Sequence, residues 1–472
     1  MASGKVYTLS LDQGGHASRA LVFDQSGQLA ASAECVIRTR TSGRLRVEHA
    51  PQALLHSLQK AADIAVGRLP RRAEISTAAL ATQRSSIACW DRRDGYALSP
   101  VISWQDRRAI RRVAALAPHT QEVRALTGLV LSPHYGASKL AWCLEHLAPV
   151  RLAQRQGQLA AGPLASFIVA NLLVEQPCVA DPVNGGRTQL LDVQRGAWSS
   201  RLCEIFGVPK EILPDCVPNA FRFGQLKAGG RSIPLTVVTG DQPAALFALG
   251  EPRADTAYVN IGTGAFVQCL RAADAPGLLH SLIWRSADET LYALEGTVNG
   301  AGAALQWLAT RSHVPMAKAL RLLPKWLTST QEPPLFLNGV GGLGAPYWRP
   351  AFRSRFIGKG GTPEKMVAVL ESVVFLLLEN LERMQQGDAR IRRITVSGGL
   401  AQLDGLCQRL ADLSGLSVVR PELHEATALG AARLAGGIAD MAAPPEGVFK
   451  SRENRPLQQR QTRWRDQMHV AL

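Results

Sequence analysis

The sequence predicts an α/β protein of two domains, each built on a sheet covered by helices. Strand-like and helix-like segments alternate along the chain, which is typical of α/β layers. Two strand–turn–strand segments with glycine at the turn, LDQGGHASRALVFD (11–24) and TAYVNIGTGAFVQCL (256–270), form a weak internal repeat that opens each half. The length of 472 residues also favours more than one domain.

The first half reads as strands around one amphipathic helix. VYTLSL alternates apolar and polar residues, and ALVF is a continuous apolar run, so a hairpin with a glycine loop is expected. A helix follows at 52–68, where leucine and alanine recur at helical spacing. ISTAALATQ (75–83) is then a strand, followed by a hairpin that turns at Asp94-Gly95.

The second half continues the alternation. IPLTVVTGDQPAALFALG (233–250) reads as strand, loop and helix, and 364–384 as a long helix. Residues 392–415 read as strand, glycine turn and helix, and LSVVRP (416–421) as a short strand. The expected domains are 1–247 and 248–441, followed by a basic tail at 442–472. The two glycine turns would face each other across a cleft, where ligands usually bind.

Composition narrows the class of protein. The chain is 46% hydrophobic and 19% charged, as in globular proteins with apolar cores. The longest apolar run, VVFLLL (373–378), is too short to span a membrane, and the N-terminus lacks the apolar core of a signal peptide. Eight cysteines without a C-x-x-C pair or metal-like spacing predict reduced thiols. We therefore expect a cytoplasmic protein without a membrane partner.

The net charge of +15 leaves three readings open. It fits nucleic-acid or membrane-surface binding, or attraction of anionic small molecules such as nucleotides. The arginines are spread in modest clusters, and no basic run is interleaved with aromatic residues. A generally basic surface without a nucleic-acid partner is the prediction.

Asp241 is the first candidate for chemistry. It follows a strand and a glycine and precedes an alanine-rich helix, a suitable position for a general base. The alternative is a helix cap, because aspartate is a favoured capping residue. On these residues alone the cap is the stronger reading.

Glycine turns supply the other candidates. The loop after Asp12 and the turn IGTGAF, with the Thr263 hydroxyl, would let a phosphate approach the backbone. For the first loop, an ordinary hairpin turn is the alternative. SGGLAQ (397–402) lies between a strand and a helix, where a nucleotide can bind at a helix N-terminus. Each motif is a weak signal alone, but the motifs in this order and at these separations are a strong one.

In combination, the motifs resemble the FGGY family of carbohydrate kinases and are most similar to the glycerol kinases. The matching stretches cover nearly the whole chain and include LDQGGHASRALVFD, VEHAPQ, SWQDRR, TGLVLSPHYGASKLAW, DPVNGGRTQLLD, TGDQPAALF, IGTGAF, YALEGTVNGAGAALQWL, GLGAPYW and EATALGAARLAG. The resemblance implies two actin/hexokinase-type (ribonuclease H-like) domains, with ATP and a sugar in the cleft. It also implies a homodimer.

The resemblance gives roles to individual residues. Asp241 would be the catalytic base, and Asp12 would help to position Mg²⁺, which prefers carboxylate, water and phosphate oxygens. Besides Asp241, the substrate pocket would contain Arg84, Ser85, Trp104, His134, Gln242 and Phe266. Besides Asp12, ATP would contact Gly14, Gly15, Arg19, Gly262, Thr263, Gly264, Gly302, Gln306, Gly399 and Leu403.

The chain departs from the family pattern at the phosphate loop and the nucleotide site. Gly15 and His16 replace two threonines, so the loop would hold phosphate through backbone N–H groups. His16 could donate as a cation or lie in solvent, and the solvated reading is favoured. Leu403 stands where the family has an asparagine that contacts adenosine, and Ser397 replaces an aspartate.

The substrate pocket departs as well. Ser85 replaces a glutamate that binds substrate hydroxyls, and His134 replaces a tyrosine. A buried site built for particular hydroxyls rejects mismatched ones strongly, so glycerol itself is in doubt. The sequence thus predicts ATP-dependent phosphorylation of a small polyol or sugar. The alternatives are a catalytically weak or inactive relative with a regulatory role and, on charge alone, a nucleic-acid binder.

Overall fold

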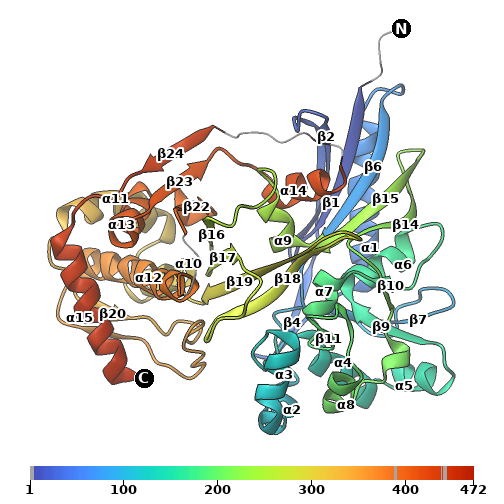
Figure 1. The fold of residues 1–472 in the computed structure, drawn as a ribbon, viewed down its shortest axis with the longest axis horizontal. Coiled ribbons are helices and arrows are strands. Elements are labelled where there is room, and N and C mark those ends of the chain that lie inside the picture. The colour runs from blue at the N-terminus through green and yellow to red at the C-terminus, as the bar shows by residue number, and fades with distance from the viewer. Residues whose placement is uncertain (1–4, 387–390, 437, 439–443) are drawn as a thin grey trace. The chain divides into compact units, whose positions relative to one another are not determined.

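The computed structural model describes residues 5–386, 391–436, 438 and 444–472 (Figure 1). The chain forms two compact units. Unit 1 comprises Met1–Pro252, Ser281–Tyr292 and His424–Ala442, and unit 2 comprises Arg253–His280, Ala293–Leu423 and Ala443–Leu472. The predicted boundary between residues 441 and 442 lies outside the described residues.

Unit 1 is built on a six-stranded mixed sheet in the order β14-β15-β6-β1-β2-β3. β1 pairs with β2 in antiparallel register, as the predicted hairpin requires, and with β6 in parallel. β6 in turn pairs in parallel with β15. The strands are β1 (Val6–Gln13), β2 (Ala17–Asp24), β3 (Leu29–Val36), β6 (Glu74–Thr82), β14 (Ala220–Ala228) and β15 (Arg231–Gly240).

Helices pack on this sheet through their apolar residues. The expected helix at 52–68 is α1 (Pro51–Gly67), which buries Leu54, Leu58 and Ala62. Two segments far apart in the chain, α9 (Asp241–Leu246) and α14 (Ala426–Leu434), pack together in unit 1, and α14 also contacts β1 and β6 (Figure 1). A Cβ added at Gly430 of α14 would lie 1.8 Å from the Ala244 carbonyl oxygen. Only glycine permits this helix–helix distance.

A second, five-stranded sheet in unit 1 has the order β4-β5-β8-β7-β9. The hairpin predicted at Asp94-Gly95 is confirmed: the Gly95 N–H donates to the Asp91 carbonyl, and Gly95 has φ +76°. The five strands of this second sheet are β4 (Thr39–Ser42), β5 (Arg46–His49), β7 (Ile87–Asp91), β8 (Val101–Ile102) and β9 (Leu159–Pro163). Two-stranded pairs are formed by β10 (Val179–Ala180) with β13 (Asp215–Cys216) and by β11 (Leu191–Asp192) with β12 (Ala197–Trp198).

The remaining unit 1 helices cover the second sheet and the region around it. α4 contacts β7 and α6 contacts β9. The helices are α2 (Ile110–Ala115), α3 (Thr120–Thr127), α4 (Gly136–His146), α5 (Ala148–Arg155), α6 (Leu164–Leu172), α7 (Pro182–Gly186) and α8 (Ser200–Phe206).

Unit 2 contains most of a seven-stranded sheet in the order β18-β19-β17-β16-β22-β23-β24. The predicted strand–turn–strand at 256–270 is confirmed as β16 and β17, and Ser281–Tyr292 of the β18–β19 hairpin groups with unit 1. The strands are β16 (Thr256–Ile261), β17 (Ala265–Leu270), β18 (Leu279–Arg285), β19 (Thr290–Val298), β22 (Arg393–Ser397), β23 (Ser417–Pro421) and β24 (Pro445–Phe449); a separate pair is formed by β20 (Leu335–Leu337) and β21 (Arg355–Ile357).

The predicted long helix is the centre of the unit 2 core. It is α12 (Thr362–Met384), and the apolar run 373–378 is buried within it. Around it lie α10 (Gly302–Arg311), α11 (Met316–Ser329) and α13 (Asp404–Ser414). No helix in the described part of the chain is long and apolar enough to cross a membrane.

The segment predicted as a basic tail is ordered where it is described. Residues 445–449 form β24, and α15 (Arg455–Ala471) packs into the unit 2 core. Leu457, Trp464 and Met468 are buried at helical spacing, and Trp464 Nε1 donates to the Phe336 carbonyl. The basic composition of this segment therefore conceals an amphipathic helix. Its Arg460 is buried too, and pairs with Glu371 of α12 at 2.7 Å.

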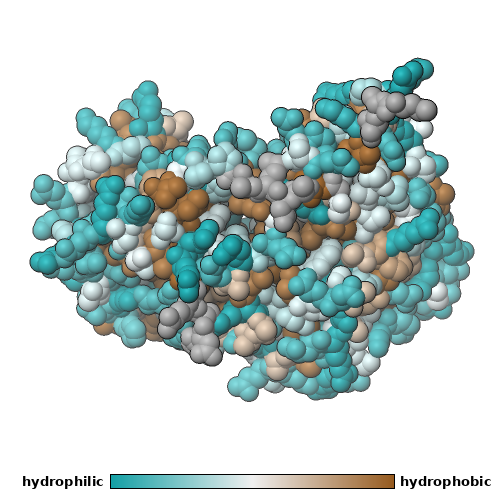
Figure 2. All heavy atoms as spheres, turned by 45° about the horizontal axis from the view of Figure 1, so that its top comes forward, coloured by the Kyte–Doolittle hydropathy of each residue, from teal (hydrophilic) through white to brown (hydrophobic). Residues whose placement is uncertain are grey.

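The face in Figure 2 is mainly hydrophilic, with apolar residues in small separate patches. Large exposed apolar side chains such as Val36, Tyr96 and Val470 come from distant parts of the sequence. Isolated apolar side chains of this kind are normal on a protein surface.

Candidate active site

Three parallel strands of unit 1 end at one edge of the sheet and carry the candidate catalytic residues. In register, Asp12 of β1 pairs with Ala81 of β6, and Thr82 of β6 pairs with Gly240 of β15. Arg84 follows β6 by two residues and Asp241 follows β15 directly. Because the carboxyl ends of parallel strands share an edge, residues 12, 84 and 241 meet although they are far apart in the chain.

Asp241 is the first residue of α9, and Gly240 is the N-cap. Asp241 is therefore not the N-cap residue, although its carboxylate still accepts from the Gln242 N–H of the first turn at 2.8 Å. The expected loop between strand and helix is also absent, since β15 runs directly into α9. Arg84 Nε lies 4.0 Å from Asp241 Oδ1, and Arg84 also donates to the Gln242 side chain. Burial raises the pKa of Asp241, and Arg84 opposes this shift.

Asp12 is 8% exposed and has a raised pKa of about 7. Burial is the main cause, the nearby Asp241 carboxylate adds to it, and Arg19 opposes it. Arg19 Nη1 lies 3.9 Å from Asp12 Oδ2, too far for a hydrogen bond. Arg19 is held instead by Glu34 at 2.7 Å and by Glu425 at 3.4 Å. Asp12 is thus a buried carboxyl whose charge is poorly compensated.

The loop between β1 and β2 is a tight turn. Its Gly14 N–H donates to the Ala17 carbonyl at 3.0 Å, so this N–H is already used within the turn. Neither Gly14 nor Gly15 has positive φ. A Cβ at Gly15 would point toward Gln83 and Trp104, at 3.6 and 3.9 Å. His16 is exposed, in agreement with the solvated reading.

Lys139 of α4 joins the segments that carry three predicted substrate residues. It is fully buried, and its Nζ donates to the carbonyl oxygens of Ser85, Ser103 and His134 at 3.0, 2.9 and 2.7 Å. The ammonium form supplies the three N–H donors that three carbonyl acceptors require, although burial lowers the pKa of Lys139 well below its usual value. The backbone N–H of Trp104 donates to Ser86 Oγ at 3.0 Å, which links Trp104 to the same region. Residues 85, 104 and 134 are therefore held together in unit 1.

His134 lies among cations and aromatic rings. Its ring packs edge-on against Trp104 and Tyr135, and Arg107 Nη2 lies 3.5 Å from its Nδ1. Burial lowers the pKa of His134 well below its usual value, and Lys139, Arg107, Arg187 and Arg84 lower it further. The imidazole is therefore neutral. Since a guanidinium only donates, Nδ1 is the acceptor and Nε2 carries the proton.

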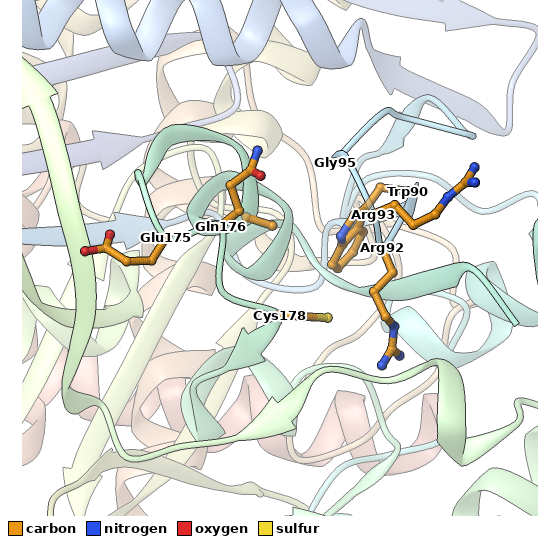
Figure 3. Close-up of a pocket in the computed structure, with 8 residues that line it drawn as sticks. Trp90, Arg92, Arg93, Gly95, Glu175, Gln176 and Cys178 are labelled. Atoms are coloured by element: carbon orange, nitrogen blue, oxygen red, sulfur yellow. The ribbon is translucent and has the colours of Figure 1, made fainter.

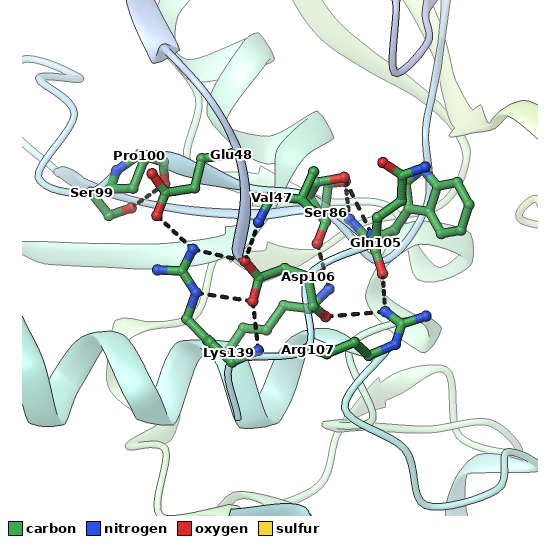
Figure 4. A network of polar contacts seen from close by, with 12 residues as sticks. Val47, Glu48, Ser86, Ser99, Pro100, Gln105, Asp106, Arg107 and Lys139 are labelled. Atoms are coloured by element: carbon green, nitrogen blue, oxygen red, sulfur yellow. Dashed lines mark hydrogen bonds and ion pairs between the residues drawn. The ribbon is translucent and has the colours of Figure 1, made fainter. Parts of the chain in front are cut away.

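A buried polar network fixes the segment that carries Trp104 and Arg107 (Figure 4). The Asp106 carboxylate accepts from the Val47 N–H at 2.7 Å and from Arg108 Nε at 2.9 Å. Arg108 also reaches Glu48 at 2.5 Å. With this acid engaged elsewhere, Arg107 donates to the carbonyl oxygens of Trp104 and Asp106 at 2.7 and 3.0 Å.

The residues predicted to bind the nucleotide lie in unit 2, except for those of the β1–β2 hairpin, which belong to unit 1. Gly262, Thr263 and Gly264 form the β16–β17 turn, in which the Gly262 N–H donates to the Gly264 carbonyl at 2.8 Å. The turn also receives the first N–H groups of α10: Gly302 donates to Gly262 at 2.9 Å. A Cβ at Gly302 would lie 2.8 Å from that oxygen, which explains the glycine. Thr263 lies between β16 and β17 in this turn and is exposed.

The other candidate residues of unit 2 lie on several different elements. Gln306 is exposed on α10, and Phe266 is half-buried on β17 opposite Thr297. Gly399 begins a 3-10 turn (Gly399–Gln402) that the sequence did not predict between β22 and α13. Leu403 precedes α13 and packs against the unit 2 core. An apolar residue there cannot supply the amide contact expected of an asparagine.

A separate pocket of about 240 Å³ lies in unit 1 (Figure 3). Its lining comprises Trp90, Arg92, Arg93, Gly95, Ala170, Glu175, Gln176 and Cys178. None of the sequence-predicted site residues lines it. Arg93 already binds Asp91 at 2.7 Å, and Arg92 binds the Glu211 carbonyl.

Sequence reasoning missed Lys139, Arg107 and Glu425. Lys139 lies in the quoted stretch TGLVLSPHYGASKLAW, and Arg107 in SWQDRR, but both are ordinary surface residues by type. Glu425 is 406 residues from its partner Arg19. The only available signal was the position of these residues inside motifs already named.

Comparison with known proteins settles the family. The model of the N-terminal domain of the FGGY family of carbohydrate kinases matches residues 7–248, and that of the C-terminal domain matches residues 257–438. The chain belongs to the FGGY family of carbohydrate kinases. It therefore has the two-domain actin/hexokinase-type fold and is an ATP-dependent phosphotransferase with an alcohol group as acceptor.

Relatives of this FGGY kinase include glycerol kinases. The glycerol kinase of Methylibium petroleiphilum is 35% identical over 91% of this chain and 90% of its own length. That of Trichlorobacter lovleyi is 35% identical over 91% and 89%. Among solved structures, Plasmodium falciparum glycerol kinase with ADP has a TM-score of 0.90 at 21% identity, covering 99% of both chains. A ligand-bound xylulose kinase from Lactobacillus acidophilus has a TM-score of 0.84 at 19% identity, covering 98% of both.

Proposed function

We propose that this FGGY kinase transfers the γ-phosphoryl group of ATP to a hydroxyl of a small polyol or sugar other than glycerol, with Asp241 as general base. The observation that supports it is the meeting of Asp12, Arg84 and Asp241 at one edge of the unit 1 sheet. Kinases of this chemistry work mainly by positioning and charge stabilisation, which such an edge can supply.

Asp241 would accept the proton of the substrate hydroxyl as its oxygen attacks the γ-phosphorus. The new O–P bond forms while the bond to the β-phosphate oxygen breaks, and ADP leaves with that electron pair. Burial raises the pKa of Asp241, which makes its carboxylate a stronger base. Arg84, 4.0 Å away, opposes this rise of the pKa and so favours the ionised carboxylate. The neighbouring Gln242 side chain, which accepts from Arg84, would contact the substrate.

The acidic residues of unit 1 fit a magnesium ion. Mg²⁺ binds one or two carboxylates together with water and phosphate oxygens. Asp12 has a poorly compensated carboxyl beside Asp241, which a dication would stabilise. Mg²⁺ would neutralise charge on the transferred phosphoryl group. Asp12 would hold it, while the turn Gly262–Gly264, Gly302 and Gln306 of unit 2 would contact the nucleotide.

The pKa of Asp12 gives a test of this site in folding stability. In the range from about pH 4 to pH 7 the unfolded chain has lost the Asp12 proton and the folded chain keeps it, so this group's contribution to stability falls as pH rises. Without Mg²⁺, the advantage of Asp12→Asn over the wild type in melting temperature should therefore be larger at pH 8 than at pH 5. Adding Mg²⁺ at pH 8 should stabilise only the wild type. A variant less stable than the wild type at pH 8 without Mg²⁺ would contradict this account.

The substrate side of the proposal depends on Ser85 and His134. A serine is shorter than the glutamate of related glycerol kinases and carries no charge, so it leaves room that a longer chain can fill. A hydrogen bond to a charged acceptor contributes about 1.5–3 kcal/mol, so its loss weakens glycerol binding. His134 keeps an aromatic ring beside Trp104 but offers an imidazole N–H in place of a phenol.

The double variant Ser85→Glu, His134→Tyr should raise kcat/KM for glycerol by about tenfold or more and lower it for the longer substrate. The measurement is ADP release with a panel of polyols and ketoses. The wild type should use glycerol poorly. A wild type that prefers glycerol to every longer polyol and ketose would overturn this part of the proposal.

An inactive relative that only binds a sugar or nucleotide is the alternative function. It predicts binding of ATP or polyol by calorimetry without ADP release for any acceptor. The same panel therefore separates the two functions.

A further inference from the structure

The surroundings of Ser85 and His134 contain several cations, and the replacement of the family glutamate by Ser85 removes a negative charge beside them. Lys139 and Arg107 both lie against these residues. Within the described residues, the hydrogen-bond acceptors of Lys139 are three backbone carbonyls, and those of Arg107 are two carbonyls and the His134 ring. No carboxylate side chain there forms an ion pair with either cation.

The nearby acids are already engaged. Asp106 is fully buried and bound by Arg108 through 2.7 and 2.9 Å contacts. Asp241 faces Arg84. Burial lowers the pKa of Arg107, and the nearby Asp106 and Tyr135 offset this shift only in part. An anion bound beside it would offset that cost.

Three hydrogen-bond donors are carried by Arg107, which contacts the His134 ring, and by the two segments that Lys139 joins. Ser85 is 4% exposed, has φ +63°, and its Oγ has no hydrogen-bond partner among the described residues. The neutral His134 presents Nε2–H, because Arg107 occupies Nδ1. Lys139 binds the backbone carbonyls of residues 85 and 134 and so holds together the two segments that carry these donors. A hydroxyl, an imidazole N–H and a guanidinium suit an acceptor with several lone pairs and a negative charge.

We propose that the substrate of this kinase is a polyhydroxy acid, whose carboxylate binds beside Arg107, Ser85 and His134 while one of its hydroxyls reaches Asp241. The proposal rests on the proposed function and narrows its substrate class. A glutamate at position 85 would repel such a carboxylate, so Ser85 makes an acidic substrate possible at the same time as it weakens glycerol binding.

The test compares neutral polyols with polyhydroxy acids of equal length: glycerol with glycerate, erythritol with erythronate, and xylitol with xylonate. ADP release gives kcat/KM, and calorimetry gives binding. We expect at least one acid to exceed its neutral partner by about tenfold or more in kcat/KM, the size of one charge-assisted hydrogen bond. Arg107→Gln should abolish most of this ratio through KM for the acid. Ser85→Glu should do the same without removing a cation, and the exposed neighbour variant Arg111→Gln should keep the ratio.

The outcomes separate this inference from the proposed function. Turnover of neutral polyols with no preference for any acid would overturn the inference and leave the kinase proposal standing. Acid binding that Arg107→Gln weakens, without ADP release from any compound, would support the anion site and contradict the proposed function. If none of the acids binds or reacts, the inference is overturned, as it is by a ratio unchanged in both Arg107→Gln and Ser85→Glu.

Discussion

Asp241→Asn should reduce turnover by about a hundredfold or more while ATP binding stays nearly unchanged. The expected loss is the scale of a removed general base. Asparagine keeps the size of the side chain at the start of α9, and it can still accept from the Gln242 N–H. It cannot take the hydroxyl proton. Steady-state kinetics with the preferred substrate, together with calorimetry for ATP, measures both quantities.

A matched control makes this result specific. Asp215→Asn changes an exposed aspartate of the same unit and should keep full turnover. Thermal unfolding should show that Asp241→Asn is folded, because the variant removes a carboxylate whose burial already raises its pKa. Turnover near the wild-type value in Asp241→Asn would remove this residue from the role of base.

Gly430→Ala should destabilise the protein and lower its activity, although it adds only one methyl group. The new Cβ would lie 1.8 Å from the Ala244 carbonyl oxygen, which is backbone and cannot rotate away. α14 must then move from α9, and α9 begins with Asp241. Overpacking of this kind costs about 1–3 kcal/mol and at times more. We expect a lower melting temperature and a reduced kcat.

Gly67→Ala is the matched control for this substitution. Gly67 ends α1, has ordinary helical backbone, and nothing lies within 4 Å of an added Cβ. Alanine is the better helix former, so the free energy of unfolding should stay equal or rise. If Gly430→Ala is as stable as Gly67→Ala, the close packing of α14 on α9 is not a constraint on this fold.

Local patterns in the sequence predicted much of the secondary structure. The β1–β2 and β16–β17 hairpins, α1 and α12 follow from apolar periodicity and glycine turns, which depend on neighbouring residues only. The same patterns marked Asp12, Asp241 and the Gly262–Gly264 turn. The FGGY resemblance then gave these residues roles, and the comparisons confirmed the family and its fold.

Other features could not be read from local pattern. The basic composition of α15 hides its apolar stripe, and local pattern does not reveal that Gly240, and not Asp241, is the N-cap of α9. Lys139 and Arg107 gain their importance from contacts with residues 27 to 54 positions away. Position in the sequence carries no information about such contacts.

The sequence by itself determined the class of this protein: an α/β chain with two glycine-turn hairpins and the motifs of a carbohydrate kinase. Only the tertiary structure decided which residues meet. Parallel pairing of β1, β6 and β15 brings Asp12, Arg84 and Asp241 to one sheet edge. Tertiary folding also packs α14 on α9, which lie far apart in the chain, and encloses Lys139 with three carbonyl oxygens. The reason is physical: hairpins and helices form from local contacts, whereas parallel pairing and buried charge depend on surfaces that exist only once the chain has folded.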